Sequence, residues 1–167
     1  VPLLGIISRL TDSEGLDILG ESIDHILDMG VQMVVMGTGD QHYHDLLGEM
    51  IQEYPQQLAI FLTFNTLLAR RIYAGSDMFL MPSRFEPCGT SQMIAMHYGS
   101  VPIVRATGGL ADTVQDYDPS TELGTGFVFQ AYDRWQLFAA VVRAVEVYKH
   151  PALWRQIQLR GMRVDFS

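Results

Sequence analysis

Short apolar runs alternate along this chain with longer segments whose apolar residues recur every three or four positions. The apolar runs occupy residues 3–7, 32–36, 58–62, 78–81, 101–104 and 127–129. Uninterrupted runs of this length, bounded by glycine or polar residues, are typical of buried strands. Helical spacing is found at residues 16–27, 46–51, 65–72 and 93–96, and in two closing segments, 137–148 and 151–162.

This alternation predicts the fold class. Strands that alternate with helices form a mainly parallel sheet with helices on both faces and right-handed crossovers. We therefore expect an α/β, Rossmann-like doubly wound fold. The 167 residues suffice for one domain with a full hydrophobic core. Because a strand pattern is already present at residues 1–5, we expect the chain to begin inside a longer protein, with any targeting segment outside it.

Composition excludes several classes of partner and site. The net charge of −8 argues against nucleic acid or an anionic membrane as the main partner. No apolar run is long enough to cross a bilayer. The single cysteine, Cys88, excludes an intramolecular disulfide and fits a reducing compartment. The histidines, including His42 and His44, lack the spacing of metal ligands, so we expect no metal site.

Residues 82–92 have the pattern of an elbow between a strand and a helix. Gly89 lets backbone approach a ligand closely, and Thr90 and Ser91 can bond the free amides of the helix that follows. The unpaired amides at a helix start favour anions. We therefore expect a phosphate site here with Glu86 at its rim; an ordinary strand–helix corner is the alternative.

Two further features lie where strands are expected to end. Arg9 follows the first strand, and glycine-rich turns follow the second and fifth strands, at 37–40 and 105–110. Ligands of open α/β sheets bind at the carboxyl ends of the strands, so Arg9 is a candidate phosphate or sugar contact; a solvated loop charge is the alternative. The turn at 37–40 is too short for the dinucleotide fingerprint, which argues against a nicotinamide-binding domain.

The segment from Thr11 to Glu14 has the Ser/Thr-x-x-Glu form of a capping box. In a capping box the glutamate side chain accepts a hydrogen bond from the backbone N–H of the capping residue. This pattern gives Glu14 a purely structural interpretation.

Together these segments resemble one family, the bacterial glycogen synthases and plant starch synthases, in their carboxy-terminal half. The resemblance covers the whole chain, and its most specific segments are 5–10, 71–77, 82–89, 105–114 and 165–167. It implies one half of a GT-B architecture, in which two Rossmann-like domains face each other. We therefore expect residues 1–167 to be the carboxy-terminal nucleotide-sugar (donor) binding domain. The amino-terminal acceptor domain is expected to be absent from this chain.

The resemblance also implies an activity. Members of the family transfer glucose from ADP-glucose to the non-reducing end of an α-1,4-glucan with retention of configuration, and the transfer needs no metal or other cofactor. The implied partners are the nucleotide sugar, the glucan acceptor and the amino-terminal domain of the same protein. The implied location is the cytoplasm of a bacterium or the plastid stroma of a plant or alga. The sequence does not separate ADP-glucose from UDP-glucose as donor.

Carried over position by position, the resemblance assigns roles to individual residues. It makes Arg9 and Glu86 the catalytic residues: Arg9 stabilises charge on the departing diphosphate, and Glu86 binds sugar hydroxyls. Phe64 stands where the family often has a tyrosine near the nucleotide base. The other implied nucleotide-sugar-binding residues are Glu14, Cys88, Gly89, Thr90, Ser91, Thr107, Gly108 and Gly109.

Two departures from the family pattern bear on function. Glu14 stands where the family has a phosphate-facing lysine, and Thr90-Ser91 replaces the usual Leu-Thr. Two opposite charges about 4 Å apart attract by roughly 4 kcal/mol at an effective dielectric constant of about 20, so a reversed charge can weaken binding substantially. We therefore keep two functions: the donor-binding half of an active glucosyltransferase, and a catalytically weakened nucleotide- or glucan-associated regulatory binding module.

Overall fold

The computed structural model describes residues 1–86 and 89–166. Within these residues, six parallel strands form one sheet in the order β3-β2-β1-β4-β5-β6. The strands are β1 (Leu3–Ile7), β2 (Gln32–Met36), β3 (Leu58–Phe61), β4 (Met78–Met81), β5 (Val101–Arg105) and β6 (Phe127–Phe129). The predicted doubly wound α/β fold is confirmed.

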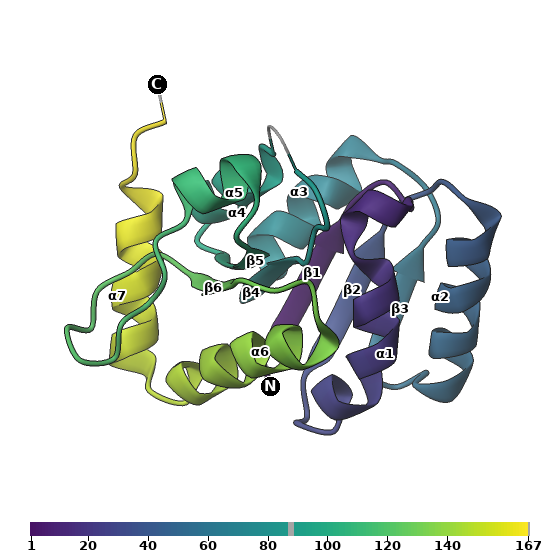
Figure 1. Ribbon diagram of the computed structural model, residues 1–167, viewed down its shortest axis with the longest axis horizontal. Helices are drawn as coiled ribbons and strands as arrows, with labels where there is room; N and C mark the ends of the chain where they lie inside the picture. The colour runs from purple at the N-terminus through teal and green to yellow at the C-terminus, as the bar shows by residue number, and fades with distance from the viewer. Residues whose placement is uncertain (87–88, 167) are drawn as a thin grey trace.

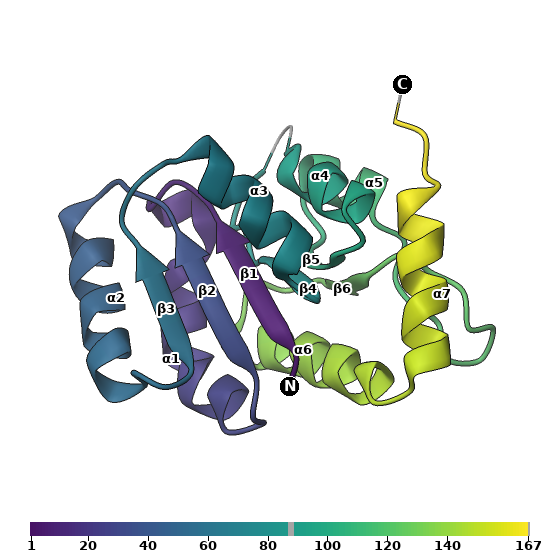
Figure 2. The ribbon, with the colours of Figure 1, turned by 180° about the vertical axis from the view of Figure 1, so that it is seen from behind.

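Helices cover both faces of the sheet, as Figures 1 and 2 show from opposite sides. Helices α1, α2 and α6 lie on one face, α3, α4 and α5 lie on the other, and α7 packs against α4 and α6. Their bounds are α1 (Leu16–Leu27), α2 (Gln41–Glu53), α3 (Thr66–Gly75), α4 (Ser91–His97), α5 (Gly108–Thr113), α6 (Arg134–Tyr148) and α7 (Pro151–Met162), with a 3-10 turn, η1 (Asp12–Glu14), before α1.

Local sequence explains where several helices begin and end. The Asn65 side chain accepts a hydrogen bond from the Leu68 N–H at 2.9 Å and so begins α3. The Asp133 carboxylate accepts two backbone N–H groups in the same way at the start of α6. Gly30 and Gly99, which follow α1 and α4, have positive φ angles of 84° and 83°, a conformation that glycine adopts at low cost.

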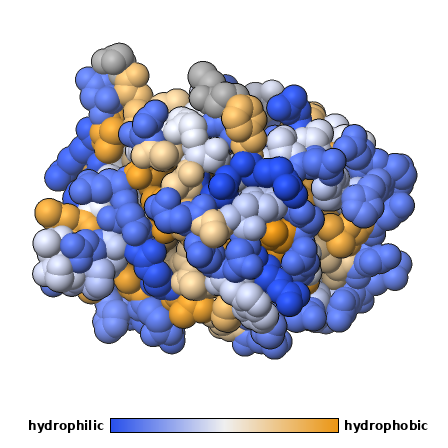
Figure 3. Space-filling model, viewed as in Figure 1, coloured by the Kyte–Doolittle hydropathy of each residue, from blue (hydrophilic) through white to orange (hydrophobic). Residues whose placement is uncertain are grey.

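Two hydrophobic layers hold the helices on the sheet. Leu19 and Val141 are fully buried in the larger layer, on the α1 and α6 side, while Phe79 and Met96 are buried in the smaller layer under α3 and α4. Each such side chain contributes about 1.5–3 kcal/mol by leaving water. The outer surface of α1 and α6 is mostly hydrophilic, with small separate hydrophobic patches (Figure 3). In the part of the chain described, no helix is long and apolar enough to span a membrane.

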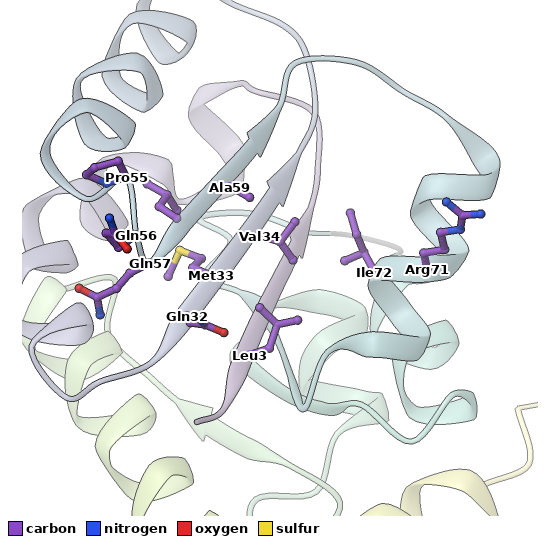
Figure 4. A pocket seen from close by; sticks show the side chains of 11 residues that line it. Leu3, Gln32, Met33, Val34, Pro55, Gln56, Gln57, Ala59, Arg71 and Ile72 are labelled. Carbon is purple, nitrogen blue, oxygen red and sulfur yellow. The ribbon is translucent and has the colours of Figure 1, made fainter.

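One face of β2 and β3 lies open beside α3 (Figure 2). A hollow of about 430 Å³ is found there, between strand residues such as Val34 and Ala59 and the α3 residues Arg71 and Ile72 (Figure 4). It is lined by the first residues of β1, β2 and β3, including Leu3, and therefore lies at the amino ends of the strands. Ligands of doubly wound sheets bind at the opposite end.

Candidate functional site

The winding of the sheet reverses between β1 and β4. From β1 the chain continues outward to β2 and β3, and from β4 it continues outward to β5 and β6. In doubly wound folds, the crevice outside the carboxyl ends of two such strands is the usual ligand site. A cleft of about 270 Å³ lies here, lined by Ile7, Ser8, Arg9, Glu14, Phe64, Met81, Glu86, Gly89, Thr90 and Ser91.

Most of the residues predicted from the sequence meet in this cleft. Those that line it are Arg9, Glu14, Phe64, Glu86, Gly89, Thr90 and Ser91. The predicted residues Thr107, Gly108 and Gly109 are not in its lining. Cys88 lies outside the described residues.

Arg9 and Glu14 face each other on one wall of the cleft. Arg9 Nη2 lies 4.0 Å from Glu14 Oε1; the Arg9 side chain is 75% exposed, but that of Glu14 is only 10% exposed. Burial raises the pKa of Glu14, the charge of Glu86 raises it further, and Arg9 opposes both effects. The carboxylates of Glu14 and Glu86 and the guanidinium of Arg9 therefore line one cleft and influence one another electrostatically.

The capping box predicted from Thr11 to Glu14 is not formed, so the structural interpretation of Glu14 is wrong. Thr11 Oγ1 lies 3.1 Å from Ser13 Oγ and caps no backbone N–H, and α1 begins only after Gly15. Gly15 has a φ of 85°, and a Cβ added there would lie 2.0 Å from the carbonyl oxygen of Pro82. This contact with the elbow interrupts the helix before it reaches Thr11 and leaves Glu14 in the cleft wall.

The opposite wall is formed by the elbow and the start of α4. A Cβ added to Gly89 would lie 2.8 Å from Glu86 Cγ, so only glycine leaves this glutamate its present place. The fully buried Gln92 donates from Nε2 to the carbonyl oxygen of Gly89 at 2.8 Å and to Thr113 Oγ1 at 2.9 Å. The start of α4 is therefore held by a buried polar side chain.

The hydroxyls of Thr90 and Ser91 do not cap α4 as predicted. Thr90, at the N-cap position, makes no side-chain cap hydrogen bond. The Ser91 side chain is instead hydrogen-bonded to Tyr73, whose pKa is raised chiefly by burial and lowered by that bond. Tertiary packing against α3 therefore overrides the local capping preference.

The glycine-rich turn after β5 contacts the elbow through a backbone hydrogen bond. The backbone N–H of Gly109 donates to the carbonyl oxygen of Glu86 at 3.2 Å. Thr107 precedes α5 as its N-cap residue, and Gly108 begins the helix with a φ of 49°. The Thr-Gly-Gly segment thus contacts the site through the backbone of Glu86.

Sequence reasoning missed the role of Arg105, which holds the elbow. Its Nη1 donates to the carbonyl oxygen of Arg84 at 2.7 Å. Arg105 ends β5, so its position at a carboxyl strand end was a signal comparable to that of Arg9. Two other residues that contact Arg84 of the elbow, Asp17 and Tyr132, were not predicted as site residues.

A second hollow adjoins the cleft at Phe64. It has a volume of about 250 Å³ and shares Ile7 and Phe64 with the cleft lining. Phe64 is 53% exposed, so its ring is open to a flat apolar group. Among residues 1–86 and 89–166, no group of three or more His, Cys, Asp or Glu side chains could hold a metal ion. The arrangement suits a ligand with a phosphate, hydroxyls and an aromatic base.

Known proteins share both the sequence and the fold. Residues 1–156 match the family model described as Glycosyl transferases group 1. The chain is 51% identical over 168 residues to the glycogen synthase of Desulforudis audaxviator, covering 100% of this chain and 34% of that protein. The catalytic domain of starch synthase IV from Arabidopsis thaliana, bound to ADP and acarbose, is similar at a TM-score of 0.90 and 37% identity, covering 99% of this chain and 35% of that one.

A third relative shows the fold alone. The C-terminal domain of a glycosyl transferase group 1 family protein from Francisella tularensis has a TM-score of 0.75 at 19% identity, covering 96% of this chain and 82% of that one. The chain spans about a third of the length of the curated relatives it matches (34% of the D. audaxviator protein).

Proposed function

The chain belongs to the glycosyl transferases of group 1, and from this premise we propose that it is the donor-binding domain of a retaining glucosyltransferase that elongates α-1,4-glucan from ADP-glucose. The observation that carries the proposal is the cleft where β1 and β4 diverge. There the guanidinium of Arg9, the carboxylate of Glu86 and the start of α4 line one space.

Each part of the cleft has a task in this reaction. Negative charge develops on the departing nucleotide diphosphate, and a fixed cation at that point lowers the barrier, which is the role of Arg9. The backbone amides of Gly89, Thr90 and Ser91, which lead into the first turn of α4, have no acceptor within that helix and donate to the distal phosphate. The Glu86 carboxylate accepts hydrogen bonds from sugar hydroxyls and favours positive charge near the anomeric carbon.

The nucleotide base lies against Phe64 in this proposal. Phe64 lines both the main cleft and the second hollow, so a base in that hollow stacks on its ring while the diphosphate extends toward Arg9. A phenylalanine provides the stacking face but has no hydroxyl to bond the base.

The glucan acceptor site belongs to a part of the protein outside this chain. The chain spans about a third of its curated relatives, and the related starch synthase domain that binds ADP and acarbose is about three times as long as the matched part (35% is covered). Residues 1–167 are thus the donor half, and a facing acceptor domain completes the site and excludes water from it.

Calorimetric titration of the chain with ADP, UDP and ADP-glucose tests the proposal. We expect ADP to bind more tightly than UDP, and Arg9→Ala to weaken ADP binding by about tenfold, the effect of a lost charge-assisted hydrogen bond. Arg155→Ala is the matched control, because Arg155 is exposed on α7 away from the cleft. Failure of all three compounds to bind, or equal loss in both variants, contradicts the proposal.

The second candidate, a catalytically weakened nucleotide- or glucan-associated regulatory module, is favoured by Glu14. This carboxylate, whose side chain is 10% exposed, lies 4.0 Å from Arg9, where a diphosphate would need positive charge. Binding of maltooligosaccharide to the chain without nucleotide favours the module, since a donor domain has no acceptor site of its own.

A further inference from the structure

One side chain that does not line the cleft holds the elbow. Arg105 donates from Nη1 to the carbonyl oxygens of Arg84 at 2.7 Å and Ser83 at 3.4 Å. Its Nε donates to the carbonyl oxygen of Gln130, in the loop between β6 and α6, at 3.1 Å. A single guanidinium therefore connects the elbow to that loop.

Tyr132, in the same loop, completes the connection. The Cζ atoms of Arg84 and Arg105 lie 4.3 Å and 5.6 Å from the centre of the Tyr132 ring, within range of cation–π attraction. The Tyr132 hydroxyl donates to one carboxylate oxygen of Asp17. The other oxygen of Asp17 accepts from Arg84 Nη2 at 3.2 Å. Arg84, Asp17 and Tyr132 thus form a closed ring of contacts, which we call the elbow clamp.

The elbow clamp joins the two walls of the cleft. Asp17 lies in the first turn of α1, directly after the turn that carries Glu14, whereas Arg84 lies in the elbow just before Glu86. The backbone N–H of Arg84 also donates to the carbonyl oxygen of Ser13 at 2.9 Å. The position of the elbow relative to the first wall therefore depends on these contacts.

The ion pair of the elbow clamp contributes little to the stability of the fold. The side chains of Arg84 and Asp17 are 55% and 36% exposed, and exposed ion pairs contribute little to stability. Their geometry matters more, because it fixes the direction in which the elbow enters the cleft. The Tyr132 hydroxyl remains protonated at neutral pH, since burial and the hydrogen bond to Asp17 raise its pKa.

We propose that Tyr132 is a positioning residue for the sugar-binding carboxylate. Its hydroxyl orients Asp17, Asp17 holds Arg84, and the elbow then presents Glu86 to the donor sugar. The inference rests on the proposed function, in which Glu86 binds sugar hydroxyls. It assigns to a loop outside the cleft a part in distinguishing a nucleotide sugar from the bare nucleotide.

Titration of ADP-glucose and ADP into Tyr132→Phe tests the inference. This variant keeps the ring over Arg84 and removes only the hydroxyl. We expect affinity for ADP-glucose to fall by about threefold to tenfold, the effect of one lost hydrogen bond, and affinity for ADP to stay unchanged. In a Glu86→Gln background, Tyr132→Phe should cause no further loss, because the two residues act through one contact.

Tyr54→Phe is the matched control. The Tyr54 hydroxyl donates to Asp24, a carboxylate on the same helix α1, and neither residue lines the cleft. The control removes the same kind of bond, so it reports any general effect on α1. We expect it to change neither affinity.

The outcomes separate this inference from the proposed function. Equal loss of ADP and ADP-glucose affinity in Tyr132→Phe, or a loss that persists in the Glu86→Gln background, overturns the positioning role. If Glu86→Gln loses affinity for ADP-glucose and Tyr132→Phe does not, the inference alone fails. If Glu86→Gln binds ADP-glucose as well as the unchanged chain does, the sugar contact itself fails and the inference falls with it.

Discussion

The backbone N–H of Gly109 donates a hydrogen bond to the carbonyl oxygen of Glu86 across 3.2 Å. This bond joins the glycine-rich turn after β5 to the elbow after β4. The two segments lie close together because β4 and β5 are neighbours in the sheet. Because this bond holds the backbone of Glu86, a steric clash at Glu86 should be relieved by movement of its side chain. Substitutions that displace the Glu86 side chain should therefore weaken the proposed binding of the donor sugar more than they lower the stability of the fold.

Gly89→Ala is expected to weaken ADP-glucose binding by about tenfold, equivalent to about 1.4 kcal/mol. The added Cβ would lie 2.8 Å from Glu86 Cγ, and a flexible side chain moves more easily than backbone, so the fold should survive. Calorimetry with ADP-glucose and a thermal unfolding curve measure the two effects. Gly48→Ala is the control, because nothing lies within 4 Å of that position in α2; it should stabilise the helix by about 0.5–1 kcal/mol and leave binding unchanged. Unaltered ADP-glucose affinity in Gly89→Ala would contradict the role of Glu86.

Glu14→Lys is expected to tighten ADP binding by about tenfold or more, most clearly at low salt. The change replaces a carboxylate beside Arg9 with a second cation, at a position 10% exposed and in the cleft wall. Glu14→Gln removes the charge without reversing it and should give an intermediate affinity. Titrations of ADP at two salt concentrations check the series; unchanged or weaker binding in a folded Glu14→Lys chain would refute the phosphate-facing position.

The stability of the chain should depend on pH through Glu14. Burial and the charge of Glu86 raise its pKa in the folded state above the ordinary value of 4.5, so the folded state binds this proton more tightly than the unfolded state does. Stability then falls as pH rises from 4.5 through the raised pKa. Glu14→Gln should be more stable than the unchanged chain above that window and equal to it well below 4.5. Urea unfolding on both sides of the window measures this, with the exposed Glu21→Gln on α1 as control; an equal difference at both pH values would disprove it.

Gly15→Ala and Gly30→Ala form a matched pair for stability. Both glycines have a φ near 85° (85° and 84°), but a Cβ at Gly15 would lie 2.0 Å from the Pro82 carbonyl oxygen, whereas nothing lies within 4 Å of Gly30. Gly30→Ala should cost about 1–2 kcal/mol for the left-handed conformation alone. Gly15→Ala should cost about 1–3 kcal/mol more, because backbone must move. Denaturant unfolding gives both values. Equal losses in the free energy of unfolding would show that the elbow leaves room for a Cβ at Gly15.

The chain alone is expected to transfer no glucose. Incubation with ADP-glucose and maltooligosaccharide should give no elongation above a blank, because the proposed function places the acceptor groups in a domain outside residues 1–167. Release of ADP and chain-length analysis of the glucan measure the result. Turnover comparable to that of a complete glycogen synthase would show that the site is self-contained.

Strand and helix positions could be predicted because their signals are local. β1 and β2 occupy the predicted residues, 3–7 and 32–36, since strands buried on both faces of a parallel sheet are continuous apolar runs. The predicted helix at 65–72 begins after its Asn65 cap. The parallel order of the strands followed from the alternation, because each crossover carries its own helix.

By itself, the sequence determined which chemistry is present at the carboxyl strand ends: Arg9 after β1, Glu86 after β4 and Gly109 after β5. Only the tertiary structure decided which groups face one another. Glu14 looked like half of a capping box, and the contact between Gly15 and Pro82 stops the helix short of it. That contact joins segments far apart in the chain, and no periodicity within one segment encodes it. The direction of a side chain depends on what its backbone packs against, so local sequence patterns do not predict it.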